Sequence, residues 1–383
     1  MTKFAKRFDG SSLLLGVVAS VFLVACDARK AAGPPAAGGA SGAAAGGSAG
    51  GTAGAPVMGS AGGVGGSAQA SGTLTVLAGG PGPSASLDGV GQNARFSDLS
   101  VIAFDGVGSV YAADGLAIRR VALATGEVTT LIQDAAQALA PDGRGNVYYT
   151  KPPYSHVVKK LDVASGTATV LAGSASCGEA CTTTDGVGTQ ASFNWPAGLV
   201  LDGAGKMFVA EANGQVIRQI DLVSGSVTTL AGTPGKVGHA DGVAAAAQFW
   251  QPWGIVSDST GDVYVNEAGN QTLRKIVPGT TEVTTLTASG FVAAGAGVDV
   301  IKFNGLNGLT IDGAGNLYIA VGDLVRKLVP ATGEMTTVVG ALGHTGVVPG
   351  PLPASLSRPM GLAALPGGRL LIASDNRILV ATF

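Results

Sequence analysis

Short apolar runs alternate with glycine-bearing polar turns along most of the chain. In residues 193–232, an apolar run at 198–201 precedes the tight turn Asp202-Gly-Ala-Gly, and further runs follow at 206–210, 215–220 and 226–230. Runs of this length, bounded by turn residues, predict short β-strands joined as hairpins. The segment therefore predicts one unit of four antiparallel strands.

The same pattern recurs in four plain copies, which cover residues 96–132, 193–232, 249–286 and 303–340. In each copy an Asp follows the leading Phe by nine residues: Phe96/Asp105, Phe193/Asp202, Phe249/Asp258 and Phe303/Asp312. A repeat of roughly 50 residues indicates a solenoid, propeller or array, and four short antiparallel strands make one propeller blade. Two degenerate copies surround Asp142 and follow Leu356. The repeat Asp residues are expected to form turns.

The two ends of the repeat region complete each other. The last copy stops after its third strand, Asn376-Arg-Ile-Leu-Val-Ala, whereas Thr73-Leu-Thr-Val-Leu-Ala-Gly matches the fourth-strand phrase Val227-Thr-Thr-Leu-Ala-Gly. Pairing these ends closes the ring and removes two exposed strand edges. We therefore predict an all-β, six-bladed β-propeller over residues 73–383, closed by its N-terminal strand.

The motif Asp312-Gly-Ala-Gly-Asn-Leu-Tyr-Ile-Ala, followed by Val325-Arg-Lys-Leu, resembles the NHL-repeat family of six-bladed β-propellers. The lead-in Asp-Gly-Val-Gly-x-x-Ala-x-Phe at 88–96 and 185–193 is also typical of bacterial members. The resemblance covers the whole predicted propeller. The second and sixth copies depart from the pattern, and the second lacks the lead-in.

Residues 1–25 read as an export signal. Lys3, Lys6 and Arg7 precede the apolar stretch 11–24, which is too short to span a membrane comfortably. The ending Leu23-Val-Ala-Cys26 resembles a bacterial lipobox, which implies cleavage before Cys26 and lipidation of its thiol. An ordinary secretory signal with an incidental cysteine is the alternative. Two or three acyl chains would make a stable anchor, so we expect a lipid-anchored protein of the bacterial cell envelope, on the outer membrane or periplasmic face.

Residues 26–72 are expected to form a linker, because from about residue 31 they are almost wholly Gly, Ala and Ser. Such a segment buries too little apolar area to offset its ordering entropy and is predicted to stay flexible. These residues and the signal also raise the mean hydropathy to +0.37, so that value does not indicate a membrane-spanning protein.

Charge is sparse, with 23 Lys and Arg against 25 Asp and Glu. Without a basic block, nucleic acid is not expected as a partner, and we expect a monomer. Cys177 and Cys181 lie in the predicted loop Cys-Gly-Glu-Ala-Cys of an exported chain, where a disulfide is expected. A metal site there would need further donors.

One column of equivalent positions follows the second strand, nine positions after the repeat Asp, and three of its residues are acidic. Its members are Asp114, Lys151, Glu211, Glu267, Val321 and Ser374. Metal-dependent lactonases and lyases occur on related six-bladed propellers, and Asp114, Glu211 and Glu267 could together hold a hard cation such as Ca²⁺. The alternative is that each acid caps a turn or pairs with a third-strand arginine. His156, His239 and His344 occupy loop positions where structural roles are expected. We predict no catalytic set and no cofactor.

A second column precedes the glycine of strand one and is expected to line the mouth of the central channel. It contains Ser100, Gln137, Ala197, Trp253, Asn307 and Met360. Because these residue types vary, the packing of the repeat does not dictate them. Trp253, Asn307 and Met360 come from consecutive blades, and Trp250 and Trp195 lie near by, which suits sugar or peptide contact. Plain packing between blades is the alternative.

Three functions are compatible with these patterns. The leading hypothesis is a lipid-anchored binding module for a protein, peptide or glycan at the loop-rich face. A metal-dependent hydrolase or lyase of lactonase type, built on the carboxylate column, is the second hypothesis. A scaffold whose ring spaces its partners is the third.

Overall fold

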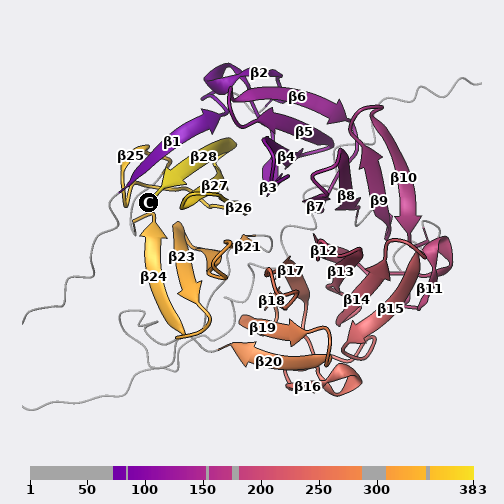
Figure 1. Ribbon diagram of the computed structural model, residues 1–383. Coiled ribbons are helices and arrows are strands. Elements are labelled where there is room, and N and C mark those ends of the chain that lie inside the picture. Colours follow the sequence, from indigo (N-terminus) through magenta and orange to yellow (C-terminus); the bar gives the residue numbers. More distant parts are fainter. Residues whose placement is uncertain (1–71, 83–84, 152–154, 175–180, 287–307, 342–345) are drawn as a thin grey trace, which may run out of the picture. The chain divides into compact units, whose positions relative to one another are not determined.

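The computed structural model describes residues 72–82, 85–151, 155–174, 181–286, 308–341 and 346–383. Within them, six antiparallel sheets follow one another around a ring (Figure 1). Each sheet runs from an inner strand near the centre to an outer strand at the rim. The predicted six-bladed β-propeller is therefore confirmed.

Blades 1 to 3 follow in chain order. Blade 1 consists of β2 (Gly89–Val90), β3 (Leu99–Phe104), β4 (Ser109–Asp114), β5 (Ala117–Ala122) and β6 (Glu127–Ile132). Blade 2 consists of β7 (Ala138–Pro141), β8 (Asn146–Thr150), β9 (Val158–Asp162) and β10 (Thr167–Ala172). Blade 3 consists of β11 (Gly186–Val187), β12 (Pro196–Leu201), β13 (Lys206–Glu211), β14 (Val216–Asp221) and β15 (Ser226–Ala231).

Blades 4 to 6 complete the ring. Blade 4 consists of β16 (Gly242–Val243), β17 (Pro252–Ser257), β18 (Val263–Glu267), β19 (Thr272–Val277) and β20 (Glu282–Leu286). Blade 5 consists of β21 (Leu309–Ile311), β22 (Leu317–Val321), β23 (Leu324–Val329) and β24 (Glu334–Val339). Blade 6 consists of β25 (Gly350–Pro351), β26 (Gly361–Leu365), β27 (Arg369–Ser374), β28 (Arg377–Thr382) and the N-terminal β1 (Thr73–Ala78). Single turns of 3-10 helix occur at η1 (Gly91–Asn93), η3 (Gly188–Gln190) and η4 (Ala244–Ala246).

The ring closes as the sequence predicts. β1 pairs antiparallel with β28, with Thr73 opposite Thr382 and Leu74 opposite Ala381. The first and last strands of the propeller therefore share one sheet, and Leu74 is fully buried in it. Pairing the two ends leaves neither strand as an open edge.

The repeat Asp residues form the turn between the first two strands of a blade. Asp105 Oδ1 accepts backbone N–H groups of Val107, Gly108 and Ser109 at 2.8, 2.8 and 2.9 Å. Asp142, Asp202, Asp258 and Asp312 accept backbone N–H groups in the same way. These hydrogen bonds satisfy donors that the tight turn leaves outside the ladder, which confirms the predicted structural role.

The leading aromatic residues pack between neighbouring blades. Phe96, Phe193, Phe249 and the substitute Leu356 are all buried. Phe193 belongs to a cluster that combines Ala138 and Val158 of blade 2 with Met207 and Val209 of blade 3. Burial of a side chain of this size stabilises each junction by about 1.5–3 kcal/mol relative to exposure.

The inner strands of all six blades surround a central cavity of about 300 Å³. Its lining is nearly all backbone and aliphatic side chains, such as Ile102, Leu199 and Ile255. Two polar side chains of the described lining hold neighbouring blades together, since Ser257 Oγ donates to Leu201 O and Thr310 Oγ1 accepts from Ala364 N. The chemistry of the ring must therefore be sought at its loops.

Candidate functional site

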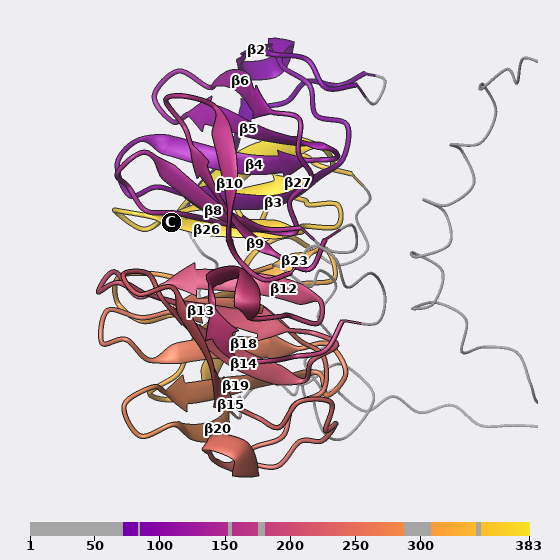
Figure 2. The same cartoon turned by 90° about the vertical axis from the view of Figure 1, so that its right-hand side faces the viewer.

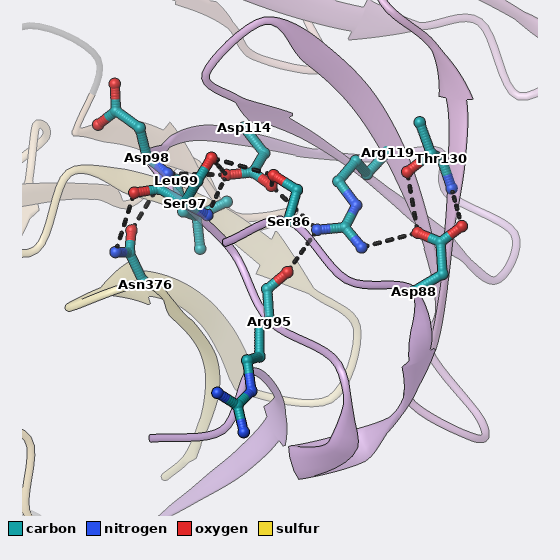
Figure 3. Close-up of polar contacts among 10 residues, drawn as sticks. All are labelled: Ser86, Asp88, Arg95, Ser97, Asp98, Leu99, Asp114, Arg119, Thr130 and Asn376. Carbon is teal, nitrogen blue, oxygen red and sulfur yellow. Dashed lines mark hydrogen bonds and ion pairs between the residues drawn. The ribbon is translucent and has the colours of Figure 1, made fainter. Parts of the chain in front are cut away.

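Each acid of the carboxylate column is buried in its own network of hydrogen bonds. Asp114 Oδ1 accepts the backbone N–H groups of Ser97 and Asp98 at 2.7 and 2.8 Å, and Oδ2 accepts from Arg119 Nη1 at 2.9 Å (Figure 3). The Arg119 guanidinium also donates to Asp88 Oδ1 at 2.7 Å and lies 4.9 Å from the ring centre of Phe96. The Asp114 carboxylate thus links the loop after Phe96 to strand β5.

The same network recurs in blades 3 and 4. Glu211 accepts from Asn194 N at 2.8 Å and from Arg218 Nη1 at 2.5 Å. Glu267 accepts from Trp250 N at 2.8 Å and from Arg274 Nη1 at 3.1 Å. All three arginines and their strand-two acids have fully buried side chains.

The pKa shifts follow from these contacts. Burial opposes ionisation of Asp114, but hydrogen bonds from Asp98, Ser86 and Arg119 outweigh it and lower the pKa of its carboxyl. Burial raises the pKa of Glu211 above its ordinary value, against the attraction of the Arg218 guanidinium. The attraction of Arg218 therefore stabilises the charged form of Glu211, whereas the hydrogen bonds of the loop and of Arg119 together stabilise that of Asp114.

The predicted metal ligands do not form a shared site. Asp114, Glu211 and Glu267 lie in blades 1, 3 and 4, each engaged by its own arginine and loop. Within the described ranges, no group of three or more His, Cys, Asp or Glu side chains is placed to hold a metal ion. The geometry supports the alternative role, in which each acid caps a loop and pairs with an arginine.

Blade 2 departs from this arrangement. By strand register Lys159 stands where blades 1, 3 and 4 have arginine, because it pairs with Tyr149 as Arg119 pairs with Ala112. Lys151 and Lys159 both contact the carboxylate of Asp134, which also accepts from the Tyr149 hydroxyl at 2.7 Å. Blade 2 therefore has two ammonium groups around one carboxylate.

The backbone carbonyl groups of Trp253 and Met360 lie close to a glycine of the preceding blade. A Cβ placed on Gly198 would lie 2.0 Å from Trp253 O, and one on Gly308 would lie 3.1 Å from Met360 O. The strand-one glycines thus let the next blade approach closely, and Trp253 sits in a β-bulge between Pro252 and Ile255. The backbone is fixed at both positions, and the side chains of Trp253 and Met360 are half-buried.

Trp250 is the exposed residue among the described members of the predicted ligand-binding set. Its side chain is 45% exposed, and its backbone N–H is held by Glu267. The ring packs over the β18–β19 turn, since a Cβ on Gly269 would lie 2.3 Å from Trp250 Cγ. Trp250 lies in the segment before β17 and Trp253 is the second residue of β17, whereas Met360 directly precedes β26. Asn307 lies outside the described residues.

Trp195 lies in blade 3, in contact with His156. The two rings meet edge to face with centroids 6.2 Å apart, and His156 Nδ1 accepts the backbone N–H of Trp195 at 3.2 Å. Equivalent contacts join other blades: Gln215 accepts from Gln251 N at 2.7 Å and Asp323 from Arg358 N at 2.9 Å. His156 therefore has the structural role expected for it, and it holds Trp195 at the junction of blades 2 and 3.

Burial lowers the pKa of His156 below its ordinary value of 6.5. Below pH 6.5 the His156 side chain binds a proton in the unfolded chain but not yet in the folded one. The folded state therefore loses stability as pH falls from 6.5 toward the folded pKa. We expect His156→Gln, which copies Gln215, to keep the hydrogen bond and weaken this pH dependence. Urea midpoints measured across this range would check it. The exposed His239→Gln serves as control, and an unchanged pH profile in His156→Gln would contradict the assignment.

Several predicted features fall outside the described residues. They are the signal peptide 1–25, Cys26, the linker up to residue 71, His344, and Cys177 of the predicted disulfide, whose other half, Cys181, is buried. Among the described residues no helix is long and apolar enough to cross a membrane.

Comparison with known proteins supports the type of repeat. No family model matches the chain. NHL repeat-containing protein 2 of Bos taurus is 30% identical over 175 residues, which cover 42% of this chain and 24% of that protein. The chain spans only 16% and 24% of the length of the two curated relatives it matches. Together with the repeat motif, this similarity identifies the blades as NHL-type repeats.

Solved structures with the same fold come from Bacteroides thetaiotaomicron. A protein of unknown function has a TM-score of 0.62 at 20% identity, covering 82% of this chain and 76% of that one. An auxiliary nutrient binding protein has a TM-score of 0.58 at 15% identity, covering 81% and 76%. Similarity at this identity shows the six-bladed propeller fold.

Proposed function

We propose that this protein binds a protein, peptide or glycan at the loop face formed by Trp250, Trp253 and Met360. The observation that carries the proposal is the exposed ring of Trp250, whose backbone is held by the buried Glu267–Arg274 pair. An aromatic side chain held in this way offers apolar contact area at little cost in conformational entropy. The auxiliary nutrient binding protein on the same fold is consistent with a binding role.

The buried state of Asp114, Glu211 and Glu267 favours a binding role over metal-dependent hydrolysis. In blades 1, 3 and 4 they already accept hydrogen bonds from backbone and arginine, with no exposed carboxylate surface. Withdrawing an acid from its arginine to bind a metal would leave a buried guanidinium with only one of its two carboxylate partners, which is costly. The carboxylate column therefore serves as the support that positions the loops.

We also propose that Cys26 carries a lipid anchor and that residues 26–72 connect it to the propeller at the bacterial cell envelope. The support is the lipobox-like Leu23-Val-Ala-Cys26 after a basic and apolar segment. A chain that begins at Gly72 lacks Cys26. If the anchor is real, this chain leaves the membrane fraction while retaining its fold, and its persistence there would contradict the proposal.

We expect Trp250→Ala and Trp253→Ala each to weaken ligand binding by roughly 10- to 100-fold, because an interface tryptophan contributes about 1–3 kcal/mol. The measurement is a glycan array and a displayed peptide library probed with the protein, followed by titration of each hit. Val223→Ala, at a 93% exposed position in the β14–β15 turn, is the control. Hits that bind both tryptophan variants as tightly as the unaltered protein would place the ligand elsewhere.

A further inference from the structure

In the described part of the chain, the outer edge of blade 2 lacks a covering strand that four other blades have. A two-residue strand pairs onto the fourth strand of four blades, as β2 on β6, β11 on β15, β16 on β20 and β25 on β1. In the described part of blade 2, β10 is the last strand of its sheet (Figure 1), and it lies on the side of the ring that faces the viewer in Figure 2. The blade 5 lead-in falls outside the described residues.

Strand register shows which groups point outward from β10. Thr130 of blade 1 pairs with Arg119 and donates its N–H outward to Asp88 Oδ2 at 3.0 Å. Val170 corresponds to Thr130, because it pairs with Lys159. Ala168 corresponds to Val128, which pairs with Gly89 of the covering strand. The backbone groups of Ala168 and Val170 therefore face outward, and no described residue bonds to them there.

The cationic side chains of blade 2 also have fewer carboxylate partners than the arginines of blades 1, 3 and 4. Arg119, Arg218 and Arg274 each hold two carboxylates: the strand-two acid and the Asp of the covering segment, namely Asp88, Asp185 or Asp241. Among the described residues, Lys151 and Lys159 of blade 2 share a single carboxylate, that of Asp134. Their side chains are 27% and 17% exposed, so the cluster carries a net positive charge that solvent can reach.

We propose that the β10 edge binds an extended acidic peptide of a partner protein, which pairs with Ala168 and Val170 as a fifth strand. An Asp or Glu of that peptide takes the place that Asp88, Asp185 and Asp241 have in the other blades, next to Lys159. The covering segments begin with Asp-Gly-Val in all three cases, so they define the chemistry of the partner: an acidic residue followed by small and β-branched residues. This surface is separate from the Trp250 face.

The probe is a synthetic peptide with the sequence of residues 182–190, Thr-Thr-Thr-Asp-Gly-Val-Gly-Thr-Gln. Titration into the isotope-labelled protein is expected to shift the amide resonances of Ala168 and Val170. The same peptide with Asp185→Asn is expected to bind about tenfold more weakly, because it loses a charge-assisted contact.

Two variants of the protein test the edge itself. Val170→Pro removes an outward N–H while leaving the ladder to β9 intact, and Val170→Lys places a charge on the edge. Both are expected to abolish the shifts. Val223→Lys, a charge at an exposed turn away from the edge, is expected to leave binding unchanged.

Three outcomes would overturn the proposal. The first is the absence of any shift at saturating peptide. The second is a set of shifts confined to β15, which would show displacement of the protein's own covering strand. The third is a dimer of the unaltered protein that Val170→Pro dissociates, which would show that a second copy occupies the edge.

Discussion

A chain that begins at Gly79 is expected to lose the cooperative unfolding of the ring. This truncation removes β1, and with it the partner of β28 and the buried side chains of Leu74 and Ala78. Loss of the Leu74 side chain alone costs about 2–5 kcal/mol, against a total stability of about 5–15 kcal/mol for a typical domain. The exposed edge of β28 should also promote aggregation.

Urea unfolding and size-exclusion chromatography would measure this loss. The matched control begins at Gly72, which retains β1 and the hydrogen bond from Leu352 N to Gly72 O. Leu74→Ala within the full chain gives an intermediate case, with Thr75→Ala as its exposed neighbour. Equal unfolding midpoints for the chains beginning at Gly72 and Gly79 would show that β1 does not close the ring.

Arg218→Met is expected to destabilise the protein by about 3–5 kcal/mol. Met keeps much of the side-chain volume but leaves Glu211 without the guanidinium that compensates its burial. It also removes the donors to Ser192 O, Thr184 O and Asp185, so the lead-in segment loses its attachment to β14. The measurement is the free energy of unfolding in urea.

The double variant Glu211→Gln with Arg218→Met separates charge from packing. Gln still accepts the Asn194 N–H but carries no charge, so the double variant is expected to be more stable than Arg218→Met alone. Arg144→Met, at an exposed turn position, is expected to change stability by less than about 0.5 kcal/mol. An effect of Arg218→Met no larger than that of Arg144→Met would refute the role given to the pair.

The repeat pattern predicted most of the fold because each of its features has a local cause. The apolar runs specify strands, the repeat Asp residues cap their own turns, and the match between the phrase at Thr73 and the fourth strand identifies the closing pair. Trp253 and Met360 also stood out in the sequence, since they vary at a position the repeat does not constrain. The reason for that freedom, the close approach of their carbonyl groups to Gly198 and Gly308, became visible only in three dimensions.

For the carboxylate column, sequence spacing could not decide between a metal site and separate ion pairs with arginine. Asp114, Glu211 and Glu267 were equally compatible with a shared cation and with separate arginine pairs, because both need an acid at the end of the second strand. In each case the loop after the leading Phe of the same blade brings a backbone N–H group to the acid, from Ser97, Asn194 or Trp250, which supports the arginine pairs. The contact recurs with the repeat, but only the folded blades show that each carboxylate is fully buried against its arginine.

The sequence by itself therefore determined the number of blades, their order and the strand that closes the ring, because these depend on local strand and turn propensities repeated at one period. Tertiary structure alone decided which charges pair and which tryptophan stays exposed, whereas the missing lead-in of the second copy already indicated the uncovered edge of β10. Lys151, Lys159 and Asp134 come from separate segments of the chain, and only the fold brings them together, with Lys159 paired to Val170 of β10.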